Sequence, residues 1–163
     1  MPTVAARILT ALAQRLQAIN GRHPYATDVE QRVLLRRPSY DMQEGLPAVF
    51  VYRKPSETQR RGLPNSELGD TTVSFGVAGV VRVEDNCAVT IEAILGDIHR
   101  ALELPNDLYL RDRALGRNLL NQPLLITAID TAPAQDALPF DIVECTVQCT
   151  YPQKYGDPDY VQP

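Results

Sequence analysis

The side chains best able to do chemistry in this sequence are those of His23, His99, Cys87, Cys145 and Cys149. A catalytic cysteine needs a histidine or another cation beside it to stabilise its thiolate. Cys145 and Cys149 fall instead on the apolar side of an alternating segment, which predicts buried thiols. Four residues of strand separate them by about 13 Å, which is too far for a disulfide. We therefore expect reduced cysteines and a protein that folds in the cytoplasm.

Motifs that would define an active site are absent from the sequence. It contains no HExxH, no paired CxxC, no GxSxG, no Walker loop and no GxGxxG. Gly76 and Gly79 lie inside a strand pattern and indicate a bulge or a close approach of another backbone. Asp157 and Asp159 flank a proline near the end of the chain, and solvated carboxylates are expected there rather than a cation site. We predict no catalytic residue, no metal site and no cofactor, and thus a protein that is not an enzyme.

The charge of the chain is modest in total but uneven along its length. The formal net charge of -4 argues against a general nucleic-acid binder. Residues 1–37 carry six Arg and two acidic residues, whereas residues 129–163 carry six acidic residues and one Lys. Such ends could attract other copies head to tail, or they could lie side by side in one chain and cancel. No apolar run approaches the ~20 residues that cross a bilayer, so no membrane partner is expected.

The strongest structural pattern runs from Thr71 to Arg100 and predicts a strand followed directly by a helix. Val73, Phe75, Val77, Val81 and Val83 alternate with polar or small residues, which is typical of a strand with one buried face. Asp85-Asn86 then offers a helix N-cap, and apolar residues follow at helical spacing as far as Leu102. A helix that folds back onto this strand would bury both apolar faces.

The other elements complete a small α+β domain. Residues 3–20 predict a helix with Thr3 as its N-cap and Gly21 as the residue that ends it. Residues 108–121 could be a short helix or a loop that covers a sheet edge. The further predicted strands are 29–37, 47–52, 124–130 and 140–151. We predict one domain over residues 1–151, built as a mainly antiparallel mixed sheet of about five strands with two helices packed on one face, and an extended C-terminal tail over residues 152–163.

The stretch from Arg53 to Asp70 has no apolar periodicity and contains prolines and glycines. Loops of this length in a compact domain are commonly functional or disordered. The alternatives are a solvated loop and a protruding arm that orders against a partner. Because interfaces favour Arg and Tyr, we predict that the arm and the tail contact partners. The candidate contact residues are Arg53, Lys54, Arg60, Arg61, Glu67, Asp70, Tyr151, Tyr155, Asp157 and Tyr160.

Several short segments resemble neck and tail proteins of tailed bacteriophages. These are the helix Ala5–Leu16 with the Ile19-Asn20-Gly21 that follows, the stretch Tyr25–Val29, the strand Leu46–Tyr52 and the ending Cys149–Pro158, which includes Tyr-Gly-Asp-Pro. The group that the chain resembles most is the tail terminator, or tail completion, family of the lambda type and its long-tailed relatives. That resemblance implies helices packed on a sheet and no catalytic residues.

The resemblance also implies a function in the virion. Members of the family form a hexameric ring that caps the tail tube, stops its polymerisation and presents a surface to the head. The implied partners are further copies of the chain, the tail tube protein and a neck or connector protein, with DNA at most passing through the lumen of the ring. The implied location is the tail or neck of a virion assembled in the bacterial cytoplasm. Head-to-tail connectors and stoppers share this size and layout, and a monomeric assembly chaperone or a small enzyme are further alternatives.

Overall fold

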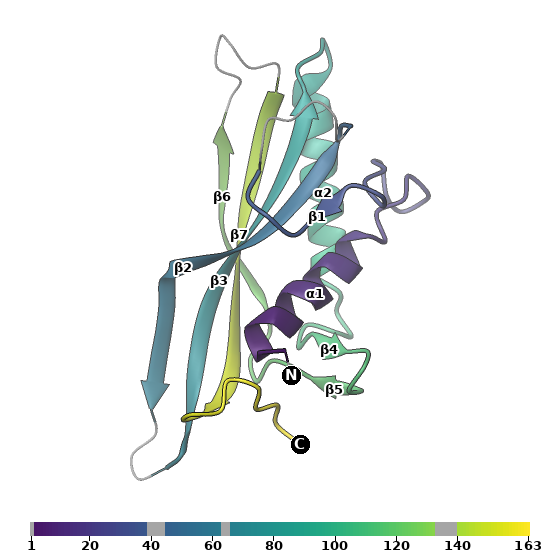
Figure 1. The fold of residues 1–163 in the computed structure, drawn as a ribbon. Coiled ribbons are helices and arrows are strands. Elements are labelled where there is room, and N and C mark those ends of the chain that lie inside the picture. Colours follow the sequence, from purple (N-terminus) through teal and green to yellow (C-terminus); the bar gives the residue numbers. More distant parts are fainter. Residues whose placement is uncertain (1, 39–44, 63–65, 133–139) are drawn as a thin grey trace.

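The computed structural model describes residues 2–38, 45–62, 66–132 and 140–163 (Figure 1). Its elements in chain order are α1 (Val4–Leu16), β1 (Val33–Leu34), β2 (Ala48–Gly62), β3 (Leu68–Arg82), α2 (Cys87–Leu102), β4 (Arg111–Asp112), β5 (Arg117–Asn118), β6 (Leu125–Ala132) and β7 (Phe140–Lys154). A five-stranded sheet has the order β1-β2-β3-β7-β6, and β4 and β5 form a separate two-stranded sheet. The predicted α+β class is confirmed.

The sheet is mixed, as predicted. β1 pairs in parallel with β2, whereas β2, β3, β7 and β6 pair antiparallel in that order. Both helices lie against one face of the sheet. The end of β2, the start of β3 and the end of β7 lie together and extend past the helices (Figure 1). The long strands therefore form a covered half under the helices and a projecting half beyond them.

The first helix is shorter than its sequence pattern. Thr3 caps it as predicted, with its Oγ1 accepting a hydrogen bond of 3.2 Å from the Ala6 amide. The helix ends at Leu16, and the next residues make tighter turns in which the Ile19 amide donates to the Leu16 carbonyl. These turns keep Ile19 fully buried, which explains why the apolar stripe continues beyond the helix. Gly21 has the expected positive φ of 74°, but it serves the following turn rather than the helix end.

The core has two sides, which corrects the prediction that the strand over residues 71–84 has one buried face. Between the helices and the sheet lies the larger cluster, which includes Phe75 and Cys149. The opposite face carries a second cluster of Ala48, Phe50, Ala78, Val80, Phe140 and Ile142. Leu34 from β1 and Leu46 from the residues just before β2 pack on this cluster, so the second half of β3 is buried on both faces. Val83 lies past the end of β3 and is 44% exposed.

The predicted loop over residues 53–70 is largely a β-hairpin. β2 continues to Gly62 and β3 begins at Leu68, with pairs from Gln59↔Thr72 to Gly62↔Gly69 and a register shift between Lys54 and Gln59. This half of the hairpin lies beyond the helices, so its side chains do not alternate between core and solvent. The strands are defined there by pairing with neighbouring strands, which apolar periodicity does not report.

Three other boundaries also differ from the sequence pattern. Residues 152–154, predicted as tail, belong to β7 and pair with the start of β3. The strand predicted over residues 29–37 is reduced to the two residues of β1. Residues 108–121 contain the small β4–β5 hairpin and no helix. In each case strand pairing rather than apolar periodicity decides the structure.

Candidate assembly surfaces

The projecting half of the sheet is the most distinctive surface of the molecule. We call it the distal sheet: residues 58–62 of β2, 68–72 of β3 and 148–154 of β7. One of its faces is hollowed into a groove of about 340 Å³. The groove is lined by Gln59, Arg60, Arg61, Asp70, Thr72, Gln122, Gln148 and Thr150. These side chains can donate and accept hydrogen bonds, so the groove is suited to contact with a polar surface.

The charged candidate residues differ in how far they are already engaged. Lys54 Nζ lies 2.6 Å from Glu144 Oε1 and donates to Thr146 Oγ1, so it links β2 to β7 across the sheet. Asp70 accepts a hydrogen bond of 2.7 Å from Asn121 Nδ2. Arg61 is exposed on the outer strand of the distal sheet. The structure therefore makes Lys54 and Asp70 links within the chain and leaves Arg61 facing solvent.

Arg53 and Glu67 lie at opposite ends of the projecting hairpin. The Arg53 guanidinium donates to Thr58 Oγ1 at 3.3 Å, across the register shift of β2. Glu67 lies just before β3, and its carboxylate is 3.8 Å from Lys154 Nζ with most of its side chain in solvent. Exposed pairs of this kind contribute little to stability, so both side chains can be re-paired by a partner at small cost.

The C-terminal segment folds onto its own domain. A Cβ at Gly62 would collide with the Tyr155 hydroxyl, so this glycine lets the tyrosine lie across the hairpin, whereas a Cβ at Gly69 would lie 2.8 Å from the Arg61 carbonyl oxygen of the paired strand. The Arg60 guanidinium is 5.8 Å from the centre of the Tyr155 ring. The Val4 amide donates to the Pro158 carbonyl at 3.0 Å, which ties the tail to the start of α1.

The remaining candidate residues of the tail are buried to different extents. Tyr151 packs in the core with 8% of its surface exposed, and burial raises the pKa of its hydroxyl despite the nearby Arg53 and Arg60. Tyr155 is half exposed and Asp157 is exposed, whereas Tyr160 is partly buried. The surface that the tail offers to a partner is therefore centred on Tyr155 and Asp157.

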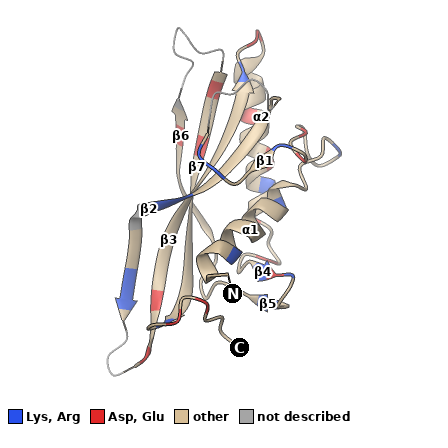
Figure 2. Ribbon diagram, viewed as in Figure 1, with Lys and Arg blue, Asp and Glu red and all other residues tan. Residues whose placement is uncertain are grey.

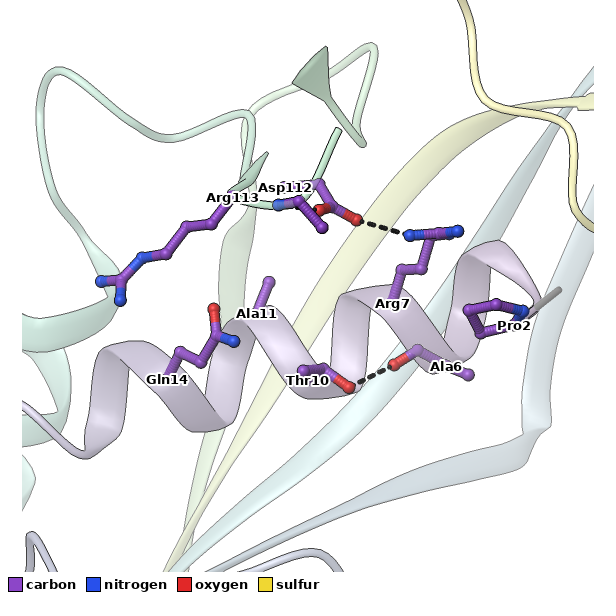
Figure 3. A pocket seen from close by; sticks show the side chains of 9 residues that line it. Pro2, Ala6, Arg7, Thr10, Ala11, Gln14, Asp112 and Arg113 are labelled. Carbon is purple, nitrogen blue, oxygen red and sulfur yellow. Dashed lines mark hydrogen bonds and ion pairs between the residues drawn. The ribbon is translucent and has the colours of Figure 1, made fainter. Parts of the chain in front are cut away.

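A smaller groove lies between α1 and the β4 hairpin (Figure 3). It encloses about 180 Å³, and Arg7 Nη1 from α1 lies 3.1 Å from Asp112 Oδ2. Burial would raise the pKa of Asp112, but the amides of Leu115 and Ala114 and the Arg7 guanidinium outweigh it and lower that pKa. Asp112 is thus an ionised anchor that holds the hairpin against α1, not a poised general base.

The cysteines are free and buried, as predicted. Burial raises the pKa of Cys145 to about 11 and that of Cys149 to about 12. Burial and the Asp141 carboxylate, 2.8 Å from its sulfur, raise the pKa of Cys87. All three therefore remain thiols near neutral pH, the form that does not act as a nucleophile. In the part of the chain that the structure describes, no three His, Cys, Asp or Glu side chains gather as metal ligands.

Two features of the structure carry little signal in the sequence. Asp97 is fully buried on α2, and its carboxylate accepts hydrogen bonds from the Ala26 and Thr27 amides. The outer edge of β6 is exposed, with Leu125 at 56% and Ile129 at 47%. In the sequence, Asp97 is an ordinary acidic residue of a helix, and Leu125 and Ile129 are ordinary apolar residues of a strand. Their roles become visible only when the structure shows which segments lie beside them.

Opposite charges from the two ends of the chain do meet within it at one place. A hollow of about 320 Å³ on the sheet is lined by Arg37 from the basic segment and by Asp130 and Glu144 from the acidic segment. Figure 2 shows the wider distribution, with basic residues along β2 and acidic residues on β6 and β7. Part of the predicted asymmetry is therefore balanced internally, and the rest is spread over different edges of the sheet. No helix within the described residues is long and apolar enough to cross a membrane.

The fold is similar to one found in a solved particle. A chain of the structure described as the virion of a native gene transfer agent particle superposes on this chain with a TM-score of 0.62 and 16% sequence identity. The match covers 92% of this chain and 98% of that chain. No family model and no curated protein sequence matches this chain. The two chains thus share their fold over almost their whole lengths.

Proposed function

We propose that this protein is a structural component of a phage-like virion: a tail terminator that forms a ring on the end of the tail tube and joins the tube to the head or neck. The observation that carries the proposal is the fold shared, over almost all of both chains, with a chain of a gene transfer agent virion. The resemblance of the helix Ala5–Leu16 and of the ending Cys149–Pro158 to tail terminators supports the finer assignment.

The surfaces support a role in assembly rather than in catalysis. The described cysteines are buried thiols, and Asp112 is held in an ion pair. The distal sheet instead offers a polar groove and an exposed strand. On this proposal the protein has no catalytic step. Its partners are copies of itself in a hexameric ring, the tail tube protein and a neck protein, with DNA passing through the lumen.

Particles assembled without this protein test the proposal. We expect electron microscopy to show tails of uncontrolled, excessive length, because nothing would stop polymerisation of the tube. Tails of normal length on heads that lose their DNA would instead identify a stopper and overturn the terminator assignment. Native mass spectrometry tests the ring separately, because a hexamer would have six times the 18.1 kDa mass of the chain. Absence of the protein from purified particles would refute a virion role altogether.

A further inference from the structure

We propose that the ring is built by edge-to-edge strand pairing, in which the outer edge of β6 in one copy pairs antiparallel with the distal outer edge of β2 in the next. The inference rests on the proposed function and deepens it by naming the surfaces that meet. We call these surfaces the β6 edge (residues 125–131) and the β2 edge (residues 59–62).

The β6 edge is an open strand. β6 is the last strand of the sheet and pairs on one side with β7. Residues 125–131 of β6 are exposed except for Ile126, which is half-buried, and the strand presents Leu125 and Ile129 to solvent. Its eight residues include no Lys, Arg or Pro, the residues that usually keep an edge from pairing, and its register shift lies near its start, between Ile126 and Ala128. An exposed apolar edge of this length is a template for another strand.

The β2 edge is open because the neighbouring strand β1 is too short to reach it. β1 covers the outer side of β2 at Val49 and Phe50, and β1 is two residues long. The pairs described for residues 59–62 are all with β3, on the inner side, and these residues are exposed. The same sheet therefore ends in two different open edges, one on each side. A contact between unlike surfaces is heterologous, which is the kind of interface that closes into a ring.

Strand direction favours this pairing. β6 is antiparallel to β7, β7 to β3 and β3 to β2, so β6 runs opposite to β2 within one copy. Within one copy β6 is level with residues 48–54 of β2, because Leu125, Gln148, Ser74 and Lys54 are in register across the sheet. Rotation about an axis inclined to the strands largely preserves their directions and supplies the stagger that brings β6 level with residues 59–62 of the next copy, where the two strands meet antiparallel. The alternation of strand directions would continue from one subunit to the next. A pairing of β6 with β6 would instead need a two-fold axis across the strands, which yields a dimer and not a ring.

Charge favours the same pairing. The charged residue of β6 is Asp130, whereas β2 from Arg53 to Gly62 contains four basic residues and one acidic residue. The acidic and basic edges are visible in Figure 2. Opposite charges steer unlike edges together, and two β2 edges would repel each other through Arg60 and Arg61. The β2 edge of a second copy therefore has the strand direction and the opposite charge that pairing with the β6 edge requires.

Two variants, each blocking one edge, test the proposal. Leu125→Lys with Ile129→Lys places positive charge on the β6 edge, and Arg60→Glu with Arg61→Glu reverses the charge of the β2 edge. Each double variant alone should be monomeric, with association weakened about tenfold or more, a loss that corresponds to about 1.4 kcal/mol. An equimolar mixture should associate in one-to-one proportion, because each variant keeps the edge that the other lacks and the two altered edges carry opposite charges.

The control is Val89→Lys, which adds a positive charge at a position on α2 that is 70% exposed and belongs to neither edge. It should assemble as the wild type does, and circular dichroism should show that all variants are folded. Native mass spectrometry of the single proteins and of the mixture gives the result. Dimers of the Arg60→Glu/Arg61→Glu variant alone would show a β6–β6 contact and overturn the proposal.

The outcomes separate this proposal from the proposed function. Rings of both edge variants that match the wild type would overturn edge pairing and leave the virion role standing. A wild-type protein that stays monomeric throughout would overturn edge pairing and the ring together. Monomeric variants that pair when mixed, beside a wild type that forms rings, would establish which surfaces meet.

Discussion

Removing the buried carboxylate of Asp97 should destabilise the protein by releasing the turn before β1. Asp97 is fully buried on α2, and its carboxylate accepts hydrogen bonds from the Ala26 amide at 3.0 Å, the Thr27 amide at 2.7 Å and the Thr27 hydroxyl at 2.7 Å. Arg100 Nη1 is also 3.0 Å from it. One side chain of the helix therefore holds a segment about seventy residues away in sequence.

The size of the effect follows from what the Asp97→Ala substitution leaves without a partner. Three donors of the turn lose a charged acceptor, and an unsatisfied buried group costs about 1–3 kcal/mol. Ala26 is exposed and Thr27 half-buried, so water reaches the released donors and the lower value applies to each. We expect a loss of about 3 kcal/mol in the free energy of unfolding. That loss corresponds to a melting temperature lower by about 6–12 °C for a chain of this size.

Urea unfolding followed by circular dichroism measures this loss, and amide hydrogen exchange at Ala26 and Thr27 localises it. Arg100→Ala is the matched control, because it removes the ion pair and leaves the turn anchored. The Arg100 side chain is 51% exposed, and exposed pairs contribute about 0–1 kcal/mol. An Asp97→Ala loss below about 1 kcal/mol would refute the reasoning. An equal loss in Arg100→Ala would show that the ion pair, and not the turn, matters.

Three further predictions concern other parts of the fold. Asp112→Asn should destabilise the protein at neutral pH, because the ionised carboxylate, whose pKa is lowered in the fold, stabilises it. The difference from wild type in urea unfolding should be complete above about 4, the pKa of an ordinary Asp, and should shrink as the pH falls below that value through the lowered pKa; a difference that persists at low pH would contradict this. Gly76→Ala should destabilise the protein by about 1–2 kcal/mol, since the new Cβ would lie 2.5 Å from Tyr52 Cζ. Gly96→Ala should stabilise α2 by up to about 1 kcal/mol, because its Cβ meets only the movable end of the Arg100 side chain. Thermal melts in which both substitutions shift the melting temperature in the same direction would count against this account. Cys149 should react with a thiol reagent only after unfolding, because burial raises its pKa to about 12, and rapid labelling of the native protein would show that the site opens.

Local patterns predicted the elements that pack against the core. The alternation through Val73 and Val77 and the helical spacing up to Leu102 indicated β3 and α2, because the residues of each that face the core between the helices and the sheet are apolar at the period of the element. β7 was indicated in the same way, with Cys145 and Cys149 on its buried face. The resemblance of short segments to phage neck and tail proteins indicated a class of protein, which the periodicity of apolar residues cannot indicate.

The candidate site was less accessible to this reasoning. Arg60, Arg61 and Tyr155 were predicted as surface contacts because of their residue types, and the structure brings Arg60 and Tyr155 together on the distal sheet. The open edge of β6 was not predicted, since an exposed edge strand and a half-buried inner strand can have the same sequence. Whether a strand has a neighbour on both sides depends on the order of strands in the sheet, which is set by contacts between distant segments.

The amino-acid sequence by itself determined the helices, the inner strands and the inert cysteines, because each of these depends on which residues a short segment must bury. The tertiary structure alone decided that residues 59–62 and 68–70 pair as strands, that Asp97 anchors a distant turn and that the sheet ends in two unlike open edges. Exposed polar residues make the pairing of the hairpin, and the edges depend on strands far apart in the chain, so no local pattern of apolar residues encodes either.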